Sequence, residues 1–380
     1  MMKKSGKKIL LAAAAAAMLL SSGCGQSAAG STEAETSQAV TETAAAEETT
    51  AEASVSAEAA ETETAGEETA GAEEEAEYID DAVLRVASLK GPTTMGLVNM
   101  MSENEAKELP FQAEFTMAAA ADEITAKVAS GDVDIALVPA NLASVLYNRT
   151  EGGVSVVDIN TLGVLYGVTG DESVKSLADL KGKTVYMTGQ GSTPEYAVNY
   201  VLSQNGLSDE VKLEFKSEAT EVAALLAEDP SNIAILPQPF ATVAMQQNDA
   251  LSQFLDLTEE WEKCADSGDS KLVTGVTIVR NEFLAEHEAL VAEFVLEHEE
   301  SALKANEDTE GTAELVAKYG IIEKAPIAKL ALPKCNIVCI TGAEMKDALS
   351  GYLSVLYNAN PKSVGGALPA DDFYAFTEVD

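Results

Sequence analysis

A short glycine-rich segment carries the residue types most suited to binding chemistry. Gly189 and Gly191 bracket Gln190 and are followed by Ser192 and Thr193. Glycines allow a tight turn that side chains would block, and a hydroxyl residue before a helix lies beside unpaired N–H groups. Such helix starts bind phosphate, sulfate or carboxylate groups. As a nucleotide fingerprint the segment is incomplete, because no third glycine completes G-x-G-x-x-G.

Residues of the same kind follow two other predicted strands. Pro92, Thr93 and Thr94 follow the first strand and offer two hydroxyls at a helix start. Asn141 opens the helix that follows the third strand. The carboxyl ends of parallel strands meet at one edge of a sheet, where ligands bind in open α/β folds. Each of these residues is a candidate ligand contact, with an ordinary turn and helix cap as the alternative.

Three further candidates are bulkier polar or aromatic residues. Gln238 and Phe240 lie in a proline-containing loop after a predicted strand, and each could contact a ligand or pack internally. Tyr166 lies on a strand that we expect to connect two parts of the fold. Its ring could stack on a flat ligand, and a buried tyrosine at a hinge is the alternative.

The sequence does not predict a metal, cofactor or catalytic site. The two histidines, His287 and His298, lie 11 residues apart and so share one helix face. Flanking glutamates suggest metal ligands, but Leu290 and Phe294 occupy the same face, which favours histidines at the edge of the core. No further histidine completes a zinc or catalytic set.

The cysteines indicate free thiols in the folded part. Besides Cys24 there are Cys264, Cys335 and Cys339, an odd number that cannot all pair internally. We expect no zinc at Cys335 and Cys339, because no histidine or third thiol is near them in the sequence. A disulfide through Cys264 is the alternative to three buried thiols.

The N-terminal segment has the composition of an export signal and a tether. Residues 1–23 join a lysine-rich start to a short apolar run and a small-residue site, which predicts a signal peptide. Small residues before Cys24 indicate lipidation of that cysteine, with simple secretion as the alternative. Residues 24–79 are rich in Ala, Thr and Glu and cannot bury enough apolar surface to fold, so we expect an extended acidic tether.

The negative net charge limits the classes of partner that this chain could bind. The formal net charge is −39 at pH 7, which argues against nucleic acid and against docking on anionic lipid through a basic face. Only three arginines exist, Arg85, Arg149 and Arg280, so few positions could grip an anion bidentately. These features favour a neutral or weakly polar ligand. The preference is slight, because helix N-termini alone can hold an anion.

The order of predicted elements indicates an α/β fold with two similar lobes. Apolar strands alternate with amphipathic helices at the spacing of βαβ units, which predicts mostly parallel sheets flanked by helices. The pattern of strand, polar loop and helix occurs twice along the chain. Beyond the second repeat we expect a helix at Phe254–Ser270 and one long helix at Asn281–Asn306.

Several segments together resemble a known family. These are LKGPTTMGLV at Leu89–Val98, DIALVPANLA at Asp134–Ala143, DLKGKTV with GSTPEYAVNYVL after it, and GVTIVRNEFLAEHEALVAEFV at Gly275–Val295. They are similar to the substrate-binding lipoproteins of ABC importers, in the group of nitrate-, sulfonate-, taurine- and thiamine-precursor-type binders. Many relatives carry an acidic residue before the loop proline where this chain has Gln238, which argues against recognition of a cation there.

The resemblance implies a two-lobed periplasmic-binding-protein fold of the second type with two crossover strands. Lobe 1 would comprise 80–163 plus 276–380, and lobe 2 would comprise 164–275. A small molecule would be bound between the lobes and delivered, without catalysis, to an ABC permease and its ATPase. The protein would be a monomer outside the cytoplasmic membrane, held there by a lipid anchor. The alternatives are a same-fold enzyme of pyrimidine or menaquinone precursor metabolism and a ligand-sensing surface lipoprotein.

Overall fold

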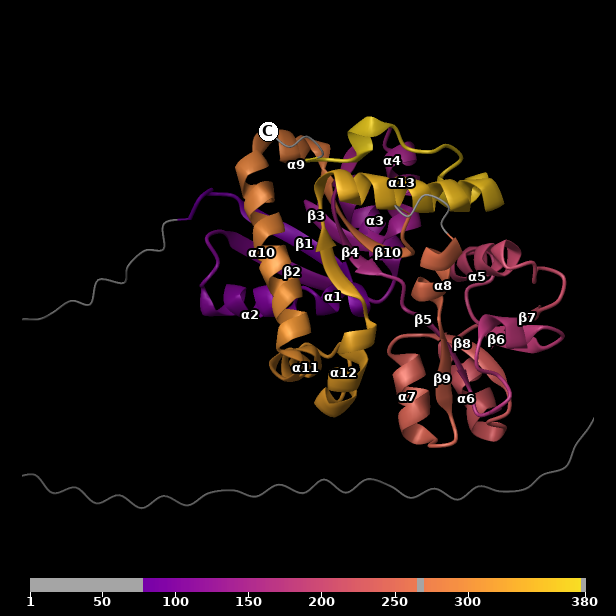
Figure 1. The fold of residues 1–380 in the computed structure, drawn as a ribbon. Coiled ribbons are helices and arrows are strands. Elements are labelled where there is room, and N and C mark those ends of the chain that lie inside the picture. The colour runs from indigo at the N-terminus through magenta and orange to yellow at the C-terminus, as the bar shows by residue number, and fades with distance from the viewer. Residues whose placement is uncertain (1–77, 265–269, 377–380) are drawn as a thin grey trace, which may run out of the picture. The chain divides into compact units, whose positions relative to one another are not determined.

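The folded part consists of two β-sheets flanked by helices, as Figure 1 shows. The computed structural model describes residues 78–264 and 270–376, all of which lie in one compact unit. The predicted signal peptide, the predicted lipidation site at Cys24 and all but the last residues of the predicted tether lie outside the described residues. The predicted α/β class is confirmed.

The larger sheet has six strands in the order β11-β4-β10-β3-β1-β2. Strands β1, β2 and β3 are parallel, and β10 is antiparallel to its neighbours β3 and β4. Strands β3, β4 and β10 are buried on both faces, as expected where helices cover a sheet, whereas the edge strand β2 is exposed or half-buried along its length. The strands are β1 (Val83–Leu89), β2 (Gln112–Ala118), β3 (Ile135–Pro139), β4 (Val154–Leu162), β10 (Val273–Arg280) and β11 (Ile337–Ile340).

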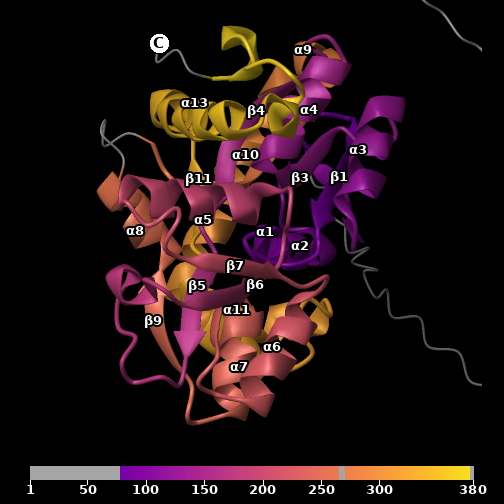
Figure 2. The same ribbon diagram turned by 90° about the vertical axis from the view of Figure 1, so that its right-hand side faces the viewer.

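The smaller sheet has five strands in the order β7-β6-β8-β5-β9. Strand β6 is parallel to β7 and β8, whereas β5 is antiparallel to β8 and β9. Figure 2, turned by 90°, again separates the elements around this sheet from those around β1 and β3. The strands are β5 (Leu165–Thr169), β6 (Thr184–Met187), β7 (Lys212–Phe215), β8 (Ile233–Pro237) and β9 (Ser252–Asp256).

We use "lobe 1" for the elements around the six-stranded sheet and "lobe 2" for those around the five-stranded sheet. Lobe 1 contains α1 (Pro92–Met95), α2 (Val98–Ala106), α3 (Ala121–Ser130), α4 (Ala140–Arg149), α9 (Asn281–Glu286), α10 (Glu288–Glu307), α11 (Thr309–Lys318), α12 (Ala325–Ala331) and α13 (Gly342–Ala359). Lobe 2 contains α5 (Thr193–Gln204), α6 (Ala219–Glu228), α7 (Phe240–Gln247) and α8 (Leu257–Cys264).

The chain passes between the sheets twice. Strand β4 leads into β5 through Gly163 and Val164, and the chain returns after α8 to enter β10. Because β10 pairs with β4 from Val273 onward, the six-stranded sheet already includes residues that the sequence assigns to lobe 2, up to 275.

Two predicted helices differ from the structure because tertiary contacts override local propensity. The segment predicted as a helix from Phe254 begins as strand β9, where Leu255 pairs with Gly167 of β5 and is buried. The long helix predicted from Asn281 is two helices, α9 and α10. His287, with φ −132° and ψ 42°, ends the first and precedes the second. Strand β11, at the edge of the larger sheet, is not predicted from the sequence.

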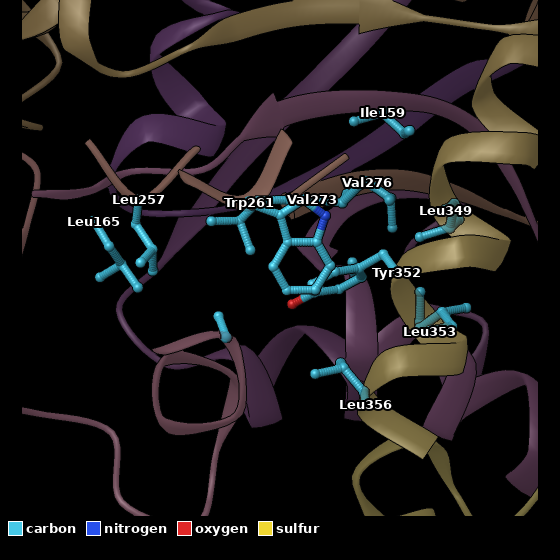
Figure 3. Close-up of a cluster of buried hydrophobic side chains, with 14 of the residues drawn as sticks. Ile159, Leu165, Leu257, Trp261, Val273, Val276, Leu349, Tyr352, Leu353 and Leu356 are labelled. Atoms are coloured by element: carbon cyan, nitrogen blue, oxygen red, sulfur yellow. The ribbon is translucent and has the colours of Figure 1, made fainter. Parts of the chain in front are cut away.

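An aromatic cluster joins the lobes. Trp261 of α8 is fully buried, and its ring centroid lies 5.7 Å from that of Tyr352 of α13 and 4.4 Å from that of Tyr200 of α5. Figure 3 shows Trp261 and Tyr352 side by side, with leucines of α13 beyond them. Helix α13 of lobe 1 therefore packs against α5 and α8 of lobe 2.

Two of the three arginines form a structural cluster. The carboxylate of Asp134, 1% exposed, accepts hydrogen bonds from Arg85 Nε at 2.8 Å and from Arg280 Nη2 at 2.9 Å. Burial alone would raise the pKa of Asp134, but these arginines and the Arg85 backbone N–H hold it below its usual value. Arg85 and Arg280 are therefore engaged with a buried carboxylate rather than with a ligand.

The described part of the chain contains no helix with the length and apolar character needed to cross a membrane.

Candidate functional site

A cavity of about 420 Å³ lies where the two lobes meet. The start of α4 borders it from lobe 1, and the start of α5 borders it from lobe 2. The first crossing segment and the residues entering β10 complete the wall. The lining residues are Pro139, Asn141, Leu142, Val164, Leu165, Ser192, Thr193, Pro194, Ala197, Pro237, Leu272 and Thr274.

Two helix N-termini border this cavity without side-chain caps. Helix α4 has Pro139 as its N-cap, and α5 has Ser192, whose hydroxyl does not cap the helix. Uncapped first turns leave backbone N–H groups without intrahelical acceptors, and the helix dipole makes these ends electropositive. The cavity is therefore suited to an oxygen-rich or anionic group placed between two helix starts.

The glycines before α5 are required by the backbone. Gly189 and Gly191 have φ values of 87° and 71°, in the left-handed region that favours glycine. A Cβ on Gly189 would lie 2.7 Å from Cγ of Pro194. The glycines in this turn thus adopt the tight backbone conformation that the sequence predicts.

Local hydrogen bonds fix this turn. The Ser192 hydroxyl donates to the Gly189 carbonyl at 2.7 Å, and the Gly191 N–H donates to Oε2 of Glu195 at 2.5 Å. The Glu195 carboxylate is therefore bound to the turn itself. The hydroxyl of Ser192 remains able to accept a hydrogen bond, because it has free lone pairs.

Tyr196 connects the turn to lobe 1. Its hydroxyl donates to the carbonyl of Gly191 at 3.0 Å and accepts from Nδ2 of Asn360 at 2.8 Å. Asn360 directly follows α13. The same phenol thus holds the binding turn of lobe 2 and forms a polar contact between the lobes.

A second tyrosine, which belongs to lobe 1, lies close to the cavity wall. Tyr352 is fully buried, and its hydroxyl lies beside the Thr193 side chain without a hydrogen bond of good geometry. Burial raises the pKa of Tyr352, so the phenol stays protonated at neutral pH. Thr193 therefore faces both the cavity and a buried phenol.

Three of the residues predicted to bind ligand line the cavity: Asn141, Ser192 and Thr193. The Asn141 side chain also donates a hydrogen bond to the carbonyl of Ser363 at 3.3 Å. Gln190 and Gly191 are exposed in the adjoining turn and are not part of the lining.

The loop at Pro92 is placed differently. Thr93 and Thr94 are buried, and their hydroxyls donate to the carbonyl of Leu89 at 2.7 Å and 2.6 Å. These threonines and Pro92 are absent from the cavity lining. Their hydroxyls hold the end of β1 and the short helix α1 in place.

Tyr166, Gln238 and Phe240 also lie outside the lining. Tyr166 is buried in the core of lobe 2, where Phe240 packs, and donates to the carbonyl of Lys334 in lobe 1 at 2.7 Å. Burial raises its pKa. The carbonyl oxygen of Gln238 accepts from the Thr242 hydroxyl at 2.8 Å. Tyr166 thus lies at the first crossing and contacts both lobes.

Sequence reasoning missed the apolar wall of the cavity. Leu142, Leu165, Ala197 and Leu272 line it, but their letters are those of ordinary core residues. Thr274 lies at the start of an apolar strand and shows no separate signal. Only their position between the lobes makes them site residues.

The two histidines differ in their surroundings, and the cysteines are unpaired, as expected. His298 is fully buried, and His287 contacts Asp80 with its Nδ1 2.8 Å from the carboxylate. Cys264, Cys335 and Cys339 are free thiols. Cys339 has no histidine near it in the sequence, but the fold brings His298 next to it together with Asp158.

The chain has recognisable relatives. A family model described as "ABC transporter, phosphonate, periplasmic substrate-binding protein" matches residues 97–263. Searching the curated proteins gives no match.

Solved structures share the fold over most of both chains. An ABC transporter protein from Parabacteroides distasonis is 22% identical, with a TM-score of 0.68, covering 78% of this chain and 100% of its own. The periplasmic aliphatic sulphonate binding protein SsuA from Escherichia coli is 16% identical, with a TM-score of 0.60, covering 76% of this chain and 96% of its own. A putative sulfonate-binding protein from Methylobacillus flagellatus is 18% identical, with a TM-score of 0.56, covering 77% of this chain and 90% of its own. The predicted resemblance and the two-lobed fold are confirmed.

Proposed function

We propose that this chain, an ABC-transporter substrate-binding protein, captures a small organic oxyanion between its lobes and delivers it unchanged to the permease and its ATPase. The observation that supports this ligand class is the meeting of two uncapped helix starts, α4 and α5, at one largely apolar cavity. The oxyanion group would face the helix starts, and a small apolar substituent would contact Leu142 and Leu165.

Energetics favour an oxyanion at this position. A helix N-terminus stabilises a nearby negative charge by about 0.3–1 kcal/mol, and more when the charge is partly buried. Each hydrogen bond to a charged group adds roughly 1.5–3 kcal/mol. The relatives named for phosphonate and sulfonate agree with this class.

A neutral polar compound is the second candidate. All twelve lining residues are uncharged, and the net charge of −39 opposes an approaching anion. Repulsion from distant exposed charges is weak at physiological ionic strength, where the Debye length is about 8 Å. We therefore rank the local donors of α4 and α5 above the overall charge.

Catalysis is not part of the proposal. Among the residues that the structure describes in the lining, the candidate nucleophiles are the hydroxyls of Ser192, Thr193 and Thr274. Activation of a hydroxyl needs a base within hydrogen-bond reach. Glu195, the nearest carboxylate on the same helix, accepts the Gly191 N–H instead.

Closure of the lobes would couple ligand capture to delivery. A ligand shifts an open–closed equilibrium only by its differential affinity for the two forms. A ligand between Asn141 of lobe 1 and Thr193 of lobe 2 contacts both lobes when they are closed. The Asn360–Tyr196 hydrogen bond and the Trp261–Tyr352 contact stabilise the same arrangement.

Removing the polar contact between the lobes should weaken ligand binding. We expect Asn360→Ala to raise the Kd roughly 5- to 10-fold, because one hydrogen bond contributes about 1 kcal/mol. Tyr196→Phe should have at least this effect, because it also frees the Gly191 carbonyl. Calorimetric titration with the stabilising ligand measures both.

A matched control is Asn148→Ala. Asn148 donates to the carbonyls of Val364 and Ala367, so its loss loosens the same C-terminal segment without removing a contact between lobes. Equal affinities of Asn360→Ala and the wild type would show that the contact does not contribute to closure.

We further propose that the mature chain is a monomer anchored by lipid at Cys24 and held from the membrane by the tether. Mass spectrometry of the mature N-terminus tests the anchor, since a diacylglyceryl modification adds a characteristic mass. An unmodified terminus at another residue would replace anchoring with secretion.

A thermal-shift screen tests the ligand class. Alkylphosphonates and alkylsulfonates should raise the melting temperature, because a ligand that binds only the folded state stabilises it by mass action. Neutral heterocycles and amino acids serve as comparison sets. Stabilisation by neutral compounds alone would replace the oxyanion with the second candidate, and turnover of the bound compound would contradict the non-catalytic function.

A further inference from the structure

Three metal-binding residue types meet inside lobe 1, away from the cavity between the lobes. Asp158 lies on β4, His298 on α10 and Cys339 on β11. Their ligating atoms all lie within 4.8 Å of one another. Asp158 and His298 are fully buried, whereas Cys339 is partly exposed at the edge of the sheet.

Neighbouring side chains already orient this cluster. His298 Nδ1 lies 3.0 Å from Oδ2 of Asp158, and the Thr277 hydroxyl donates to Oδ1 of the same carboxylate at 2.7 Å. Thr277 in turn accepts from Nδ2 of Asn160 at 3.1 Å. Hydrogen-bonded supports of this kind fix metal ligands in proteins.

The charges of the cluster are poorly balanced by protein groups alone. Among the described residues, no lysine or arginine forms an ion pair with Asp158; its partner is His298. Nε2 of His298 is buried and lacks a hydrogen-bond partner. Beside a neutral imidazole, the buried carboxylate of Asp158 keeps its hydrogen bonds but has no cation next to it, which is costly in a dry interior.

We propose that Asp158, His298 and Cys339 form a binding site for a divalent metal ion of the zinc type. Nitrogen, oxygen and sulfur donors together suit zinc and its borderline neighbours rather than magnesium or calcium. A dication would be balanced by the Asp158 carboxylate and the Cys339 thiolate, the thiol proton passing to solvent. Zinc–ligand bonds of about 2.0–2.3 Å place neighbouring donors roughly 3–4 Å apart, close to the separation in the cluster.

The position of Cys339 at the sheet edge gives an ion access from solvent. It also determines which elements a bound ion would join. Strand β11 is an edge strand whose pairing with β4 is irregular between Ile337 and Ile340. Solvent can reach Cys339 from that edge. A bound ion would tie β11 to β4 and α10. The residue before β11, Asn336, donates to the Gly163 carbonyl at the first crossing at 2.6 Å, so the ion would also steady this side of the hinge.

Cobalt titration of the metal-free full chain tests the site. We expect a near-ultraviolet thiolate-to-cobalt charge-transfer band with one equivalent of Co²⁺, displaced by Zn²⁺. Cys339→Ser should remove the band and weaken Zn²⁺ binding by at least about 100-fold. Thr277→Val, which removes only a supporting hydrogen bond, should weaken binding roughly 10-fold.

Cys335→Ser is the matched control, because Cys335 is buried four residues away and is outside the cluster. It should keep the band. The chain with Cys264→Ser should also keep it. Absence of the band in the wild type, or its persistence in Cys339→Ser, would overturn the proposal. If Cys339→Ser does not fold, a band lost in His298→Asn but kept in His287→Asn supports the proposal, and equal bands in both overturn it.

Discussion

Replacing Ser192 with tryptophan should abolish ligand capture. Ser192 lies at the exposed rim of the cavity, so an indole there can enter the empty space without displacing core side chains. It would occupy the volume beside the start of α5 and block the helix N–H groups. We expect the Kd to rise at least about 100-fold, equivalent to losing about 3 kcal/mol of ligand contact. Calorimetric titration and ligand-induced thermal shift both measure this loss.

The matched control places tryptophan elsewhere on the same helix. Ser203 is exposed in the last turn of α5 and lies outside the cavity lining. Ser203→Trp should bind ligand as the wild type does, and the ligand-free melting temperatures should agree. Unchanged affinity in Ser192→Trp would show that the ligand binds somewhere else.

Removing the carboxylate of Asp134 should have the largest effect on stability. Its two oxygens satisfy Arg85, Arg280 and the Arg85 backbone N–H, and the residue lies between β1 and β10. Hydrogen bonds to a charged group contribute about 1.5–3 kcal/mol, and the loss stays near this range because the Arg85 side chain is 39% exposed and Arg280 keeps its pair with Glu282. We expect Asp134→Ala to lower the free energy of unfolding by that amount in urea denaturation.

Acid titration gives an independent check on Asp134. The folded state lowers the pKa of the Asp134 carboxyl. The ionised carboxylate therefore stabilises the fold at pH values above its unfolded pKa, which is near 3.9. That contribution is lost as pH falls through the folded value, so the wild type should lose it below about pH 4. Asp134→Ala should lack this part of the pH dependence. Glu214→Ala, which breaks the exposed pair with Lys212, is the control and should leave stability almost unchanged. A similar small change in Asp134→Ala would show that the cluster is not structurally important.

The turn before α5 could be predicted because its cause is local. Gly189 and Gly191 signal positive φ, and Ser192 and Thr193 mark a helix start. These features depend on residues within one turn of each other. Thr93 and Thr94 after β1 are also hydroxyl residues at a helix start, but their hydroxyls bond to the Leu89 carbonyl and do not line the cavity. The sequence identifies a hydroxyl residue at a helix start, whereas the direction in which the hydroxyl points depends on tertiary packing.

The rest of the site depends on contacts between distant segments. Leu165 and Leu272 are apolar residues whose role comes from the meeting of two crossing segments. The Tyr196–Asn360 contact joins residues 164 positions apart, and no local pattern marks either one. Strand β11 was missed because it is short and pairs only at the sheet edge. His298 and Cys339 therefore could not be placed together from sequence.

A crystal structure of the full chain with the compound that stabilises it most tests the central claim directly. We predict electron density for one unmodified molecule in the cavity, with its oxygen atoms at the starts of α4 and α5 and contacts to both Asn141 and Thr193. Density outside this cavity, or contacts with one lobe only, would contradict capture between the lobes.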